Sequence, residues 1–245
     1  DYRRKFLHSV GQRIYEIKKS TIDDMWARLS VLGAGREVGR SCFLLQTPES
    51  RIMIDCGLNI AATGKYAYPY LNAPEFHIED LDAIIISHSH LDHCGFLPYL
   101  YKMGYRGPTY LTEPTRDIFA LLALDYVELS HAAKPLYTSA DVKEAIKHTI
   151  ALEFGEVTDI TPDIRLTFYN AGHILGSAMI HLHIGEGWHN LIYTGDLKVK
   201  PTMMLNAAQI TFPRVETLIM ESTYGAPDDV MPSREECEDK QMKIN

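Results

Sequence analysis

The most constraining feature of the sequence is the segment SHSHLDHCG, which directly follows the apolar run AIII. It places His88, His90, Asp92 and His93 in one turn between an expected strand and an expected helix. Three imidazoles and a carboxylate so close together are not packing groups, because buried polar side chains need partners. At an extended strand end His88 and His90 point to the same side, where both rings can reach one ion. Imidazole and carboxylate ligands suit zinc, so the segment predicts a metal site.

Two later strand ends carry further candidates. His173 follows RLTFYNAG and Asp196 closes LIYTGD. Each alone is typical of an ordinary turn residue, but beside an incomplete cluster we expect His173 as the third ligand of one metal and Asp196 as a bridge between two metals. Asp55, at the end of RIMID, is interpreted as a carboxylate that orients a ligand, although an ordinary strand-end aspartate explains it nearly as well. His181 and His183 alternate within AMIHLHI, are expected to point outward, and are given no role.

The order of apolar patterns predicts the architecture. Short aliphatic runs from Trp26 onward (ARLSVL, SCFLLQT, RIMID, DAIII) predict strands, a helical block follows, and strands return in DIRLTFYN, SAMIHLHI, NLIYTGD and TLIMES. Such an order predicts an α/β fold in which two sheets pack face to face with helices outside. The glycines of GAGREVGRS predict a hairpin turn between the first two strands.

Besides a short helix in GFLPYLYKMG that Gly104 ends, helices are expected in four places. One begins near Pro114, with an apolar stripe formed by Ile118, Leu121, Leu122, Tyr126 and Leu129. A second follows Thr138, where Asp141 completes a capping box, and a third follows a similar box of Ser233 and Glu236. Residues 1–24 form a basic amphipathic helix or linker whose apolar positions are Leu7, Val10, Ile14 and Ile17.

Composition excludes several classes of protein. The 245 residues carry 24 Lys and Arg against 32 Asp and Glu, a net charge of -8 that argues against a uniformly basic nucleic-acid binder. It does not argue against a nuclease, whose metal ligands are acidic. No apolar run approaches the roughly 18 residues of a membrane-spanning helix. The four cysteines are scattered without a CxxC pair, which predicts reduced thiols and a cytoplasmic protein.

The motifs together resemble a known family. HSHLDH at 88–93, preceded by Asp55 and followed by His173 and Asp196, resembles the motif series of the metallo-β-lactamase fold. The strings LGAGREVGRSC, IMIDCG, ISHSHLDHCGFLPYL, AGHILGSA, YTGD and IMESTYG resemble the beta-CASP nucleases, especially the archaeal cleavage and polyadenylation specificity factor type. The resemblance implies a metallo-β-lactamase-type αββα sandwich, C-terminally incomplete. After the linker at 1–24, it implies a metallo-β-lactamase domain at 25–221 and the start of a truncated beta-CASP domain at 222–245.

For function, the resemblance implies a two-zinc endoribonuclease of mRNA 3′-end processing, in which a metal-bridging hydroxide attacks a phosphodiester. On the family's pattern one zinc is held by His88, His90 and His173. The other is held by Asp92 and His93, with Asp196 as the bridge. Glu221 in IMESTYG matches the acidic residue of the first accessory motif, which pairs with a general-acid histidine. The candidate catalytic residues are therefore Asp55, Asp92 and Glu221.

Part of the family's site is missing. The general-acid histidine and the last ligand of the second zinc follow a long inserted domain that this sequence does not contain. We therefore expect a catalytic-core fragment with an incomplete second zinc site and weak activity of its own. RNA is the expected partner, no membrane association is expected, and a homodimer would form through regions absent from this chain.

Two alternatives stay open. HxHxDH is shared by small-molecule hydrolases of the same fold that act on thioesters or lactams, although IMESTYG and EVGRSC belong to the nucleic-acid branch. A scaffold subunit without metals is the non-enzymatic alternative. The intact set of candidate ligands argues against it.

Overall fold

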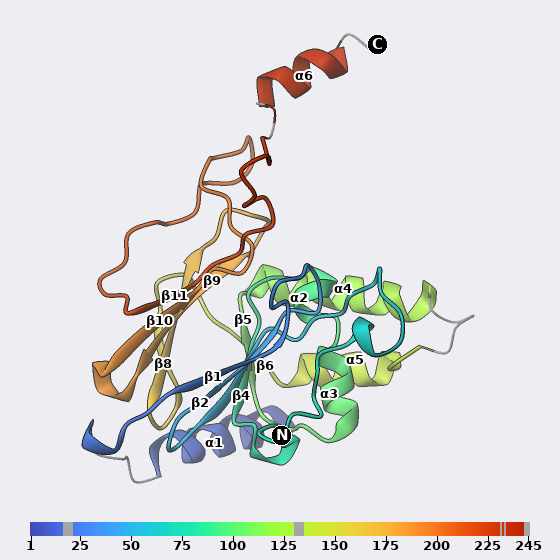
Figure 1. The fold of residues 1–245 in the computed structure, drawn as a ribbon. Helices are drawn as coiled ribbons and strands as arrows, with labels where there is room; N and C mark the ends of the chain where they lie inside the picture. Colours follow the sequence, from blue (N-terminus) through green and yellow to red (C-terminus); the bar gives the residue numbers. More distant parts are fainter. Residues whose placement is uncertain (17–21, 130–134, 231, 233, 243–245) are drawn as a thin grey trace.

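Two β-sheets packed face to face form the centre of the chain (Figure 1). The structure, a computed structural model, describes residues 1–16, 22–129, 135–230, 232 and 234–242. The first sheet has the order β1 (Arg28–Gly33), β2 (Cys42–Gln46), β3 (Arg51–Ile54), β4 (Ala83–Ile85), β5 (Thr109–Leu111), β6 (Thr149–Ala151). The second has the order β11 (Thr217–Ile219), β10 (His189–Tyr193), β9 (Ala178–Ile184), β8 (Ile164–Asn170), β7 (Val157–Thr161). Short 3₁₀ turns lie at η1 (Ile22–Asp24), η2 (Gly64–Ala67), η3 (Ile78–Asp80) and η5 (Gly185–Gly187).

Strand direction decides where a site can lie. β1 and β2 form the predicted hairpin, while β3 to β6 run parallel to one another. In the second sheet β8 and β10 each pair antiparallel with β9, and β11 is parallel to β10. Side chains alternate between the two faces of a strand, so Ile52, Ile54 and Ile85 of the first sheet pack against Leu166 and Ile180 of the second.

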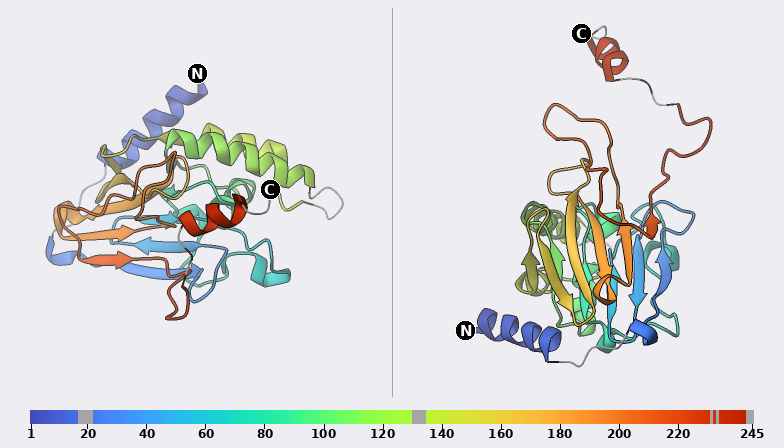
Figure 2. Two further views of the ribbon diagram at one scale, coloured as in Figure 1. Left: turned by 90° about the horizontal axis from the view of Figure 1, so that it is seen from above. Right: turned by 90° about the vertical axis from the view of Figure 1, so that its left-hand side faces the viewer.

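Helices cover the other face of the first sheet (Figures 1 and 2). They are α2 (Leu91–Cys94), α3 (Leu97–Met103), α4 (Glu113–Leu129) and α5 (Ser139–Lys147). Gly104 ends α3 in the left-handed conformation at φ 115°, and the capping box of Thr138 and Asp141 begins α5 as predicted. The α/β sandwich predicted from the order of the elements is confirmed.

The predicted apolar stripe of α4 is wrong. The buried side chains are Thr115, Phe119, Ala123 and Val127, whereas Leu121 is 69% exposed and Leu129 is also exposed. The remaining three predicted stripe residues, Ile118, Leu122 and Tyr126, are half-buried. The helix carries large apolar residues on more than one face, so their periodicity did not identify the face that packs.

The N-terminal helix α1 (Tyr2–Tyr15) is docked through specific contacts. Phe6 and Ile14 are its buried residues, whereas Leu7 of the predicted stripe is exposed and Ile17 lies outside the described residues. Arg13 pairs with Asp82 at 2.7 Å. The hydroxyls of Tyr2 and Tyr15 bond to His148, beside β6, and to Asp159 in β7, so α1 holds one end of both sheets.

The outer face of the second sheet is covered differently from that of the first. Over the described residues no helix lies on it (Figure 2). The segment 197–216 packs against it through Leu197, Ala208 and Phe212. His181 therefore does not reach solvent as expected: it points away from the other sheet but is fully buried, with its ring 4.1 Å from that of His183.

The chain ends in α6 (Arg234–Met242), which lies apart from the sheets (Figures 1 and 2). This is the helix predicted near the end of the chain, and Ser233 of its expected capping box is outside the described residues. In the part of the chain that the structure describes, no helix is long and apolar enough to cross a bilayer. All four cysteines are free thiols.

Candidate metal centre

The predicted site residues follow the carboxyl ends of strands that point the same way. Asp55 follows β3, and the 88–93 segment follows β4. His173, Asp196 and Glu221 follow β8, β10 and β11 of the second sheet. Both sheets therefore deliver side chains to one edge of the sandwich, which is where open α/β sheets place their ligands.

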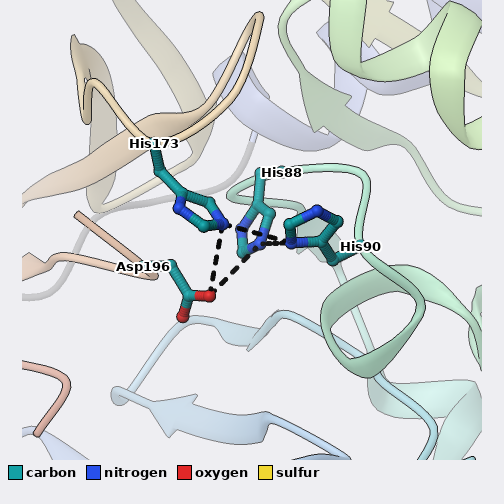
Figure 3. Close-up of side chains that lie close together, drawn as sticks. All are labelled: His88, His90, His173 and Asp196. Atoms are coloured by element: carbon teal, nitrogen blue, oxygen red, sulfur yellow. Dashed lines mark hydrogen bonds and ion pairs between the residues drawn. The ribbon is translucent and has the colours of Figure 1, made fainter. Parts of the chain in front are cut away.

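Four side chains converge there, and their nearest ligand atoms all lie within 4.8 Å of one another: His88, His90, His173 and Asp196 (Figure 3). The Nδ1 atom of His90 is 3.2 Å from Nε2 of His88 and 3.1 Å from Nε2 of His173. Oδ2 of Asp196 is 3.4 Å from Nε2 of His173 and 3.8 Å from Nε2 of His88.

These donors fit a divalent metal. Neutral imidazole carries one N–H, so three ring nitrogens turned toward one point bring lone pairs together, and a cation relieves this repulsion. Burial, and then the neighbouring rings of His93, His90 and His173, hold the pKa of His88 well below its usual value. His88 is therefore neutral, which is the form that binds metal.

A second set of donors adjoins the first. Nε2 of His93 is 3.3 Å from Oδ1 of Asp196 and 3.8 Å from Oδ2 of Asp92. Oδ2 of Asp196 thus faces His88 and His173, and Oδ1 faces His93, so Asp196 lies between the two sets of donors. Burial opposes the charged form of His93, but its hydrogen bonds with Asp196 and Asp55 outweigh this and raise the pKa of His93 to about 10.

Asp55 fixes the orientation of His93. Its fully buried carboxylate accepts hydrogen bonds at 2.7 Å from the Ser87 amide, the Ser87 hydroxyl and His93 Nδ1, and one at 2.9 Å from the Tyr193 hydroxyl. Nδ1 of His93 donates to Asp55, so Nε2 is the ring nitrogen that faces Asp92 and Asp196. This arrangement supports the interpretation of Asp55 as an orienting carboxylate.

A cleft opens beside the second set of donors. Asp92, His93 and Asp196 line one side, and the 221–223 segment lines another. Glu221 lies in this wall, where its Oε1 accepts a 3.0 Å hydrogen bond from the Leu197 amide. The third side is formed by the β1–β2 turn, residues 34–39, whose glycines predicted only a hairpin turn.

Close backbone packing holds these loops together. A Cβ atom on Gly57 would lie 1.7 Å from the carbonyl oxygen of Asp92, and one on Gly195 would lie 2.9 Å from the Ser87 side chain. Both positions therefore require glycine. The Ser41 amide donates to the same Asp92 carbonyl at 2.8 Å, which ties the β1–β2 turn to the metal-site segment.

Comparison with known proteins assigns the family. Residues 44–223, most of the chain, match the model of the metallo-beta-lactamase superfamily domain. The chain belongs to this superfamily. The solved structures with which it shares its fold include a protein of unknown function from Enterococcus faecalis (TM-score 0.52, 18% identity, 71% of this chain and 44% of that one). A metallo-beta-lactamase mutant from Cronobacter sakazakii gives a TM-score of 0.50 at 21% identity, over 76% of this chain and 66% of that one.

Curated relatives are much closer in sequence. The transcription termination factor FttA of Methanothermobacter thermautotrophicus is 57% identical over 98% of this chain, and that of Methanocaldococcus jannaschii is 53% identical over 98%. In both cases the chain spans 38% of the relative's length. The metallo-beta-lactamase fold and the archaeal beta-CASP resemblance that the motifs indicated are thus confirmed.

Proposed function

We propose that this chain is the catalytic core of a zinc-dependent RNA-processing nuclease that hydrolyses phosphodiester bonds. The observation that carries the proposal is the convergence of His88, His90, His173 and Asp196 at the carboxyl ends of strands from both sheets. Membership of the metallo-beta-lactamase superfamily supports a metal-dependent hydrolase. The relatives are named transcription termination factors, and this name supports RNA as the substrate.

The residues divide between two metal positions that share Asp196. His88, His90 and His173 would hold the first zinc, and Asp92 and His93 the second. Zinc, when bound, supplies Lewis acidity that lowers the pKa of water and offsets negative charge on a phosphate. The donor set, three imidazoles with carboxylates, is one that zinc prefers.

The chain's own side chains prepare this site. Asp55 holds His93 with Nε2 toward the cleft, and the Ser87 hydroxyl, which donates to Asp55, also lies 3.0 Å from Nδ1 of His88. Glu221 holds the 197 backbone beside the cleft, and one of its roles would be to orient a proton donor to the leaving oxygen. That donor would come from the part of the longer relatives that this chain does not span.

The remaining assignments follow from the same proposal. Residues 25–221 would be the metallo-β-lactamase domain, 1–24 a linker that precedes it, and 222–245 the start of an inserted beta-CASP domain. The protein would act in the cytoplasm on RNA at mRNA 3′ ends, and homodimerise through regions outside this chain.

Metal content tests the site directly. We expect the purified 245-residue chain to retain about one zinc firmly and a second weakly after mild dialysis, measured by inductively coupled plasma mass spectrometry. His90→Ala should lose the firmly held zinc, whereas His189→Ala, a half-buried histidine remote from the cluster, should keep it. Absence of zinc in the wild-type chain would refute the assignment of the ligands.

RNA cleavage tests the reaction. A longer protein with the relatives' full length should cleave a labelled single-stranded RNA, and the 245-residue chain should do so weakly. Asp92→Ala should abolish cleavage in the longer protein, whereas Asp125→Ala, on the exposed side of α4, should leave it unchanged. If the longer protein hydrolyses a thioester or a lactam but not RNA, the small-molecule alternative is correct.

A further inference from the structure

Two loops meet at the rim of the cleft, opposite the metal-site segment. The β1–β2 turn contributes residues 34–40, and the segment after β3 contributes residues 59–70. The Arg40 guanidinium donates to the carbonyls of Tyr68 at 3.0 Å and Lys65 at 3.3 Å, and the Asn59 amide donates to Val38 at 3.3 Å. The loops therefore form one surface. We call Arg36, Arg40, Lys65 and Tyr66 the rim patch.

Tyr66 provides an aromatic surface within the rim patch. Its side chain is 58% exposed, although large aromatic rings usually bury more of their surface. The Arg40 guanidinium carbon lies 5.8 Å and the Lys65 ammonium 5.2 Å from the centre of the ring. An exposed ring surrounded by cations suits a planar group that carries negative charge beside it, as a nucleotide does.

Arg36 connects the rim patch to the reaction site. It lines the cleft together with Asp92, His93 and Glu221. Its side chain is exposed, and among the described residues it forms no hydrogen bond or ion pair that would fix it. Its backbone is left-handed at φ 68°, a strained conformation for a residue with a side chain. The guanidinium of Arg36 therefore lies at the cleft without a partner in the described part of the protein, on a backbone that is strained.

The local charge also favours an anionic ligand. The stretch from Cys56 to Pro74 contains Lys65 and no aspartate or glutamate, in a chain whose net charge is -8. In the β1–β2 turn the single carboxylate, Glu37, is paired with Arg40 at 2.7 Å. Lys65 therefore presents positive charge beside Tyr66, and Arg36 presents at the cleft a guanidinium that no described residue pairs with.

From these contacts we infer that the rim patch is a binding site for single-stranded RNA, in which Tyr66 stacks on a base and Arg36 pairs with a phosphate as the strand enters the cleft. The inference rests on the proposed function and adds to it the single-stranded form of the substrate and the side of the cleft along which it runs. Stacking on a tyrosine accepts any base, so this site would bind without strong sequence preference.

Binding measured without cleavage tests the inference. The 245-residue chain is titrated, in EDTA, against a fluorescein-labelled oligouridylate of roughly 12 nucleotides, within the site size of one binding groove. Tyr66→Ala should weaken binding about 5- to 150-fold, the loss expected for one stacked base, while Tyr66→Phe keeps the ring and should bind like the wild type.

Arg36→Gly separates the phosphate contact from stacking. Glycine suits the left-handed backbone, so this variant should be at least as stable as the wild type, and a loss of affinity cannot come from misfolding. The slope of log affinity against log salt should fall by about 0.7, the value for one phosphate contact with a single strand. Tyr66→Ala should leave that slope unchanged.

The inference would be overturned if the wild type did not bind the oligouridylate, or if both variants bound it with unchanged affinity. A change of the sedimentation coefficient in Tyr66→Ala would also overturn it, because the patch would then be a protein interface. The proposed function fails separately, if the longer protein does not cleave RNA while the patch variants still lose affinity. Cleavage with unaltered binding by the variants would refute the rim patch alone.

Discussion

Asp55 shows how much of the metal centre depends on a residue that need not touch a metal. Its carboxylate accepts four hydrogen bonds, and its backbone is left-handed at φ 55°, an unusual conformation for a residue with a side chain. The contacts that hold this strained backbone are the same ones that orient His93. A strained backbone conformation of this kind persists only where many surrounding contacts hold it in place.

Asp55→Asn should therefore weaken the second metal position. The amide nitrogen of asparagine donates and cannot accept, so one of the groups that now donate to Asp55 would lose its acceptor and the ring of His93 would lose its fixed orientation. We expect a 10- to 100-fold loss of affinity for the weaker zinc, measured by competition with a chromophoric chelator. Tyr193→Phe, which removes one donor of the four, should cost about 1 kcal/mol of stability and leave zinc affinity nearly unchanged. Equal affinity in Asp55→Asn and the wild type would contradict the orienting role.

The sequence allowed the converging residues to be proposed because each follows a strand and has metal-binding chemistry. It did not reveal Tyr193, which lies 138 positions from Asp55 and has no local pattern that marks it as a partner. For the same reason the sequence did not predict that residues 34–39 line the cleft. That role depends on how the β1–β2 turn lies against the metal-site segment, not on the composition of either segment.

Among the elements, α4 was predicted in the right place but with the wrong face inward. The packing residues recur every four positions, and two of them, Thr115 and Ala123, are too small or too polar to stand out beside exposed leucines. The strands β6 (TIA) and β7 (VTDIT) were not predicted, because three to five residues without clear alternation carry no periodic signal.

Substitutions in α4 distinguish the two faces. Phe119→Ala should lower the free energy of unfolding by about 3–5 kcal/mol, since it opens a cavity between α4 and the first sheet. Leu121→Ala, two positions along the same helix, should change it by less than about 0.5 kcal/mol. Urea denaturation followed by circular dichroism measures both. Comparable losses would show that the predicted stripe, not the observed face, packs inward.

His181, buried on the outer face of the second sheet, should make the free energy of unfolding depend on pH. Burial, and then the neighbouring His183 ring, lower the pKa of His181 to about 4. Its usual pKa is about 6.5, so between pH 6.5 and 4 the unfolded chain binds more protons. Stability should fall by up to about 3 kcal/mol as the pH falls through this window, and be unaffected by His181 above it. His181→Leu should show a shallower loss than the wild type in urea melts across that range. Parallel curves would show that His181 takes up its proton over the same pH range in the folded and the unfolded chain.

For the whole molecule, the candidate metal centre joins the two sheets. His88 and His90 come from the first sheet, and His173 and Asp196 from the second. A metal that binds only the folded chain stabilises it in proportion to the logarithm of its concentration over its dissociation constant. The total charge of -8 describes the surface poorly at this point, because acidic side chains at the cleft would be offset by bound cations.

Chelation should accordingly destabilise the whole chain. Removing zinc with EDTA should lower the melting temperature by roughly 2–4 °C for each kcal/mol of binding energy lost. The chain with His90→Ala should melt below the zinc-loaded wild type and respond little to EDTA. An equal response of both proteins would mean that the stabilising metal binds elsewhere.

The same geometry sets the order of events during synthesis. His173 lies 83 positions after His90, so a growing chain carries the 88–93 donors on the order of ten seconds before His173 has been made. In that interval the segment can hold an ion only loosely, and any metal it picks up can leave again. Selection of the metal would thus be deferred until the second sheet has been made and has docked. The identity of the bound ion would then depend on metal supply at the end of folding and not at its start.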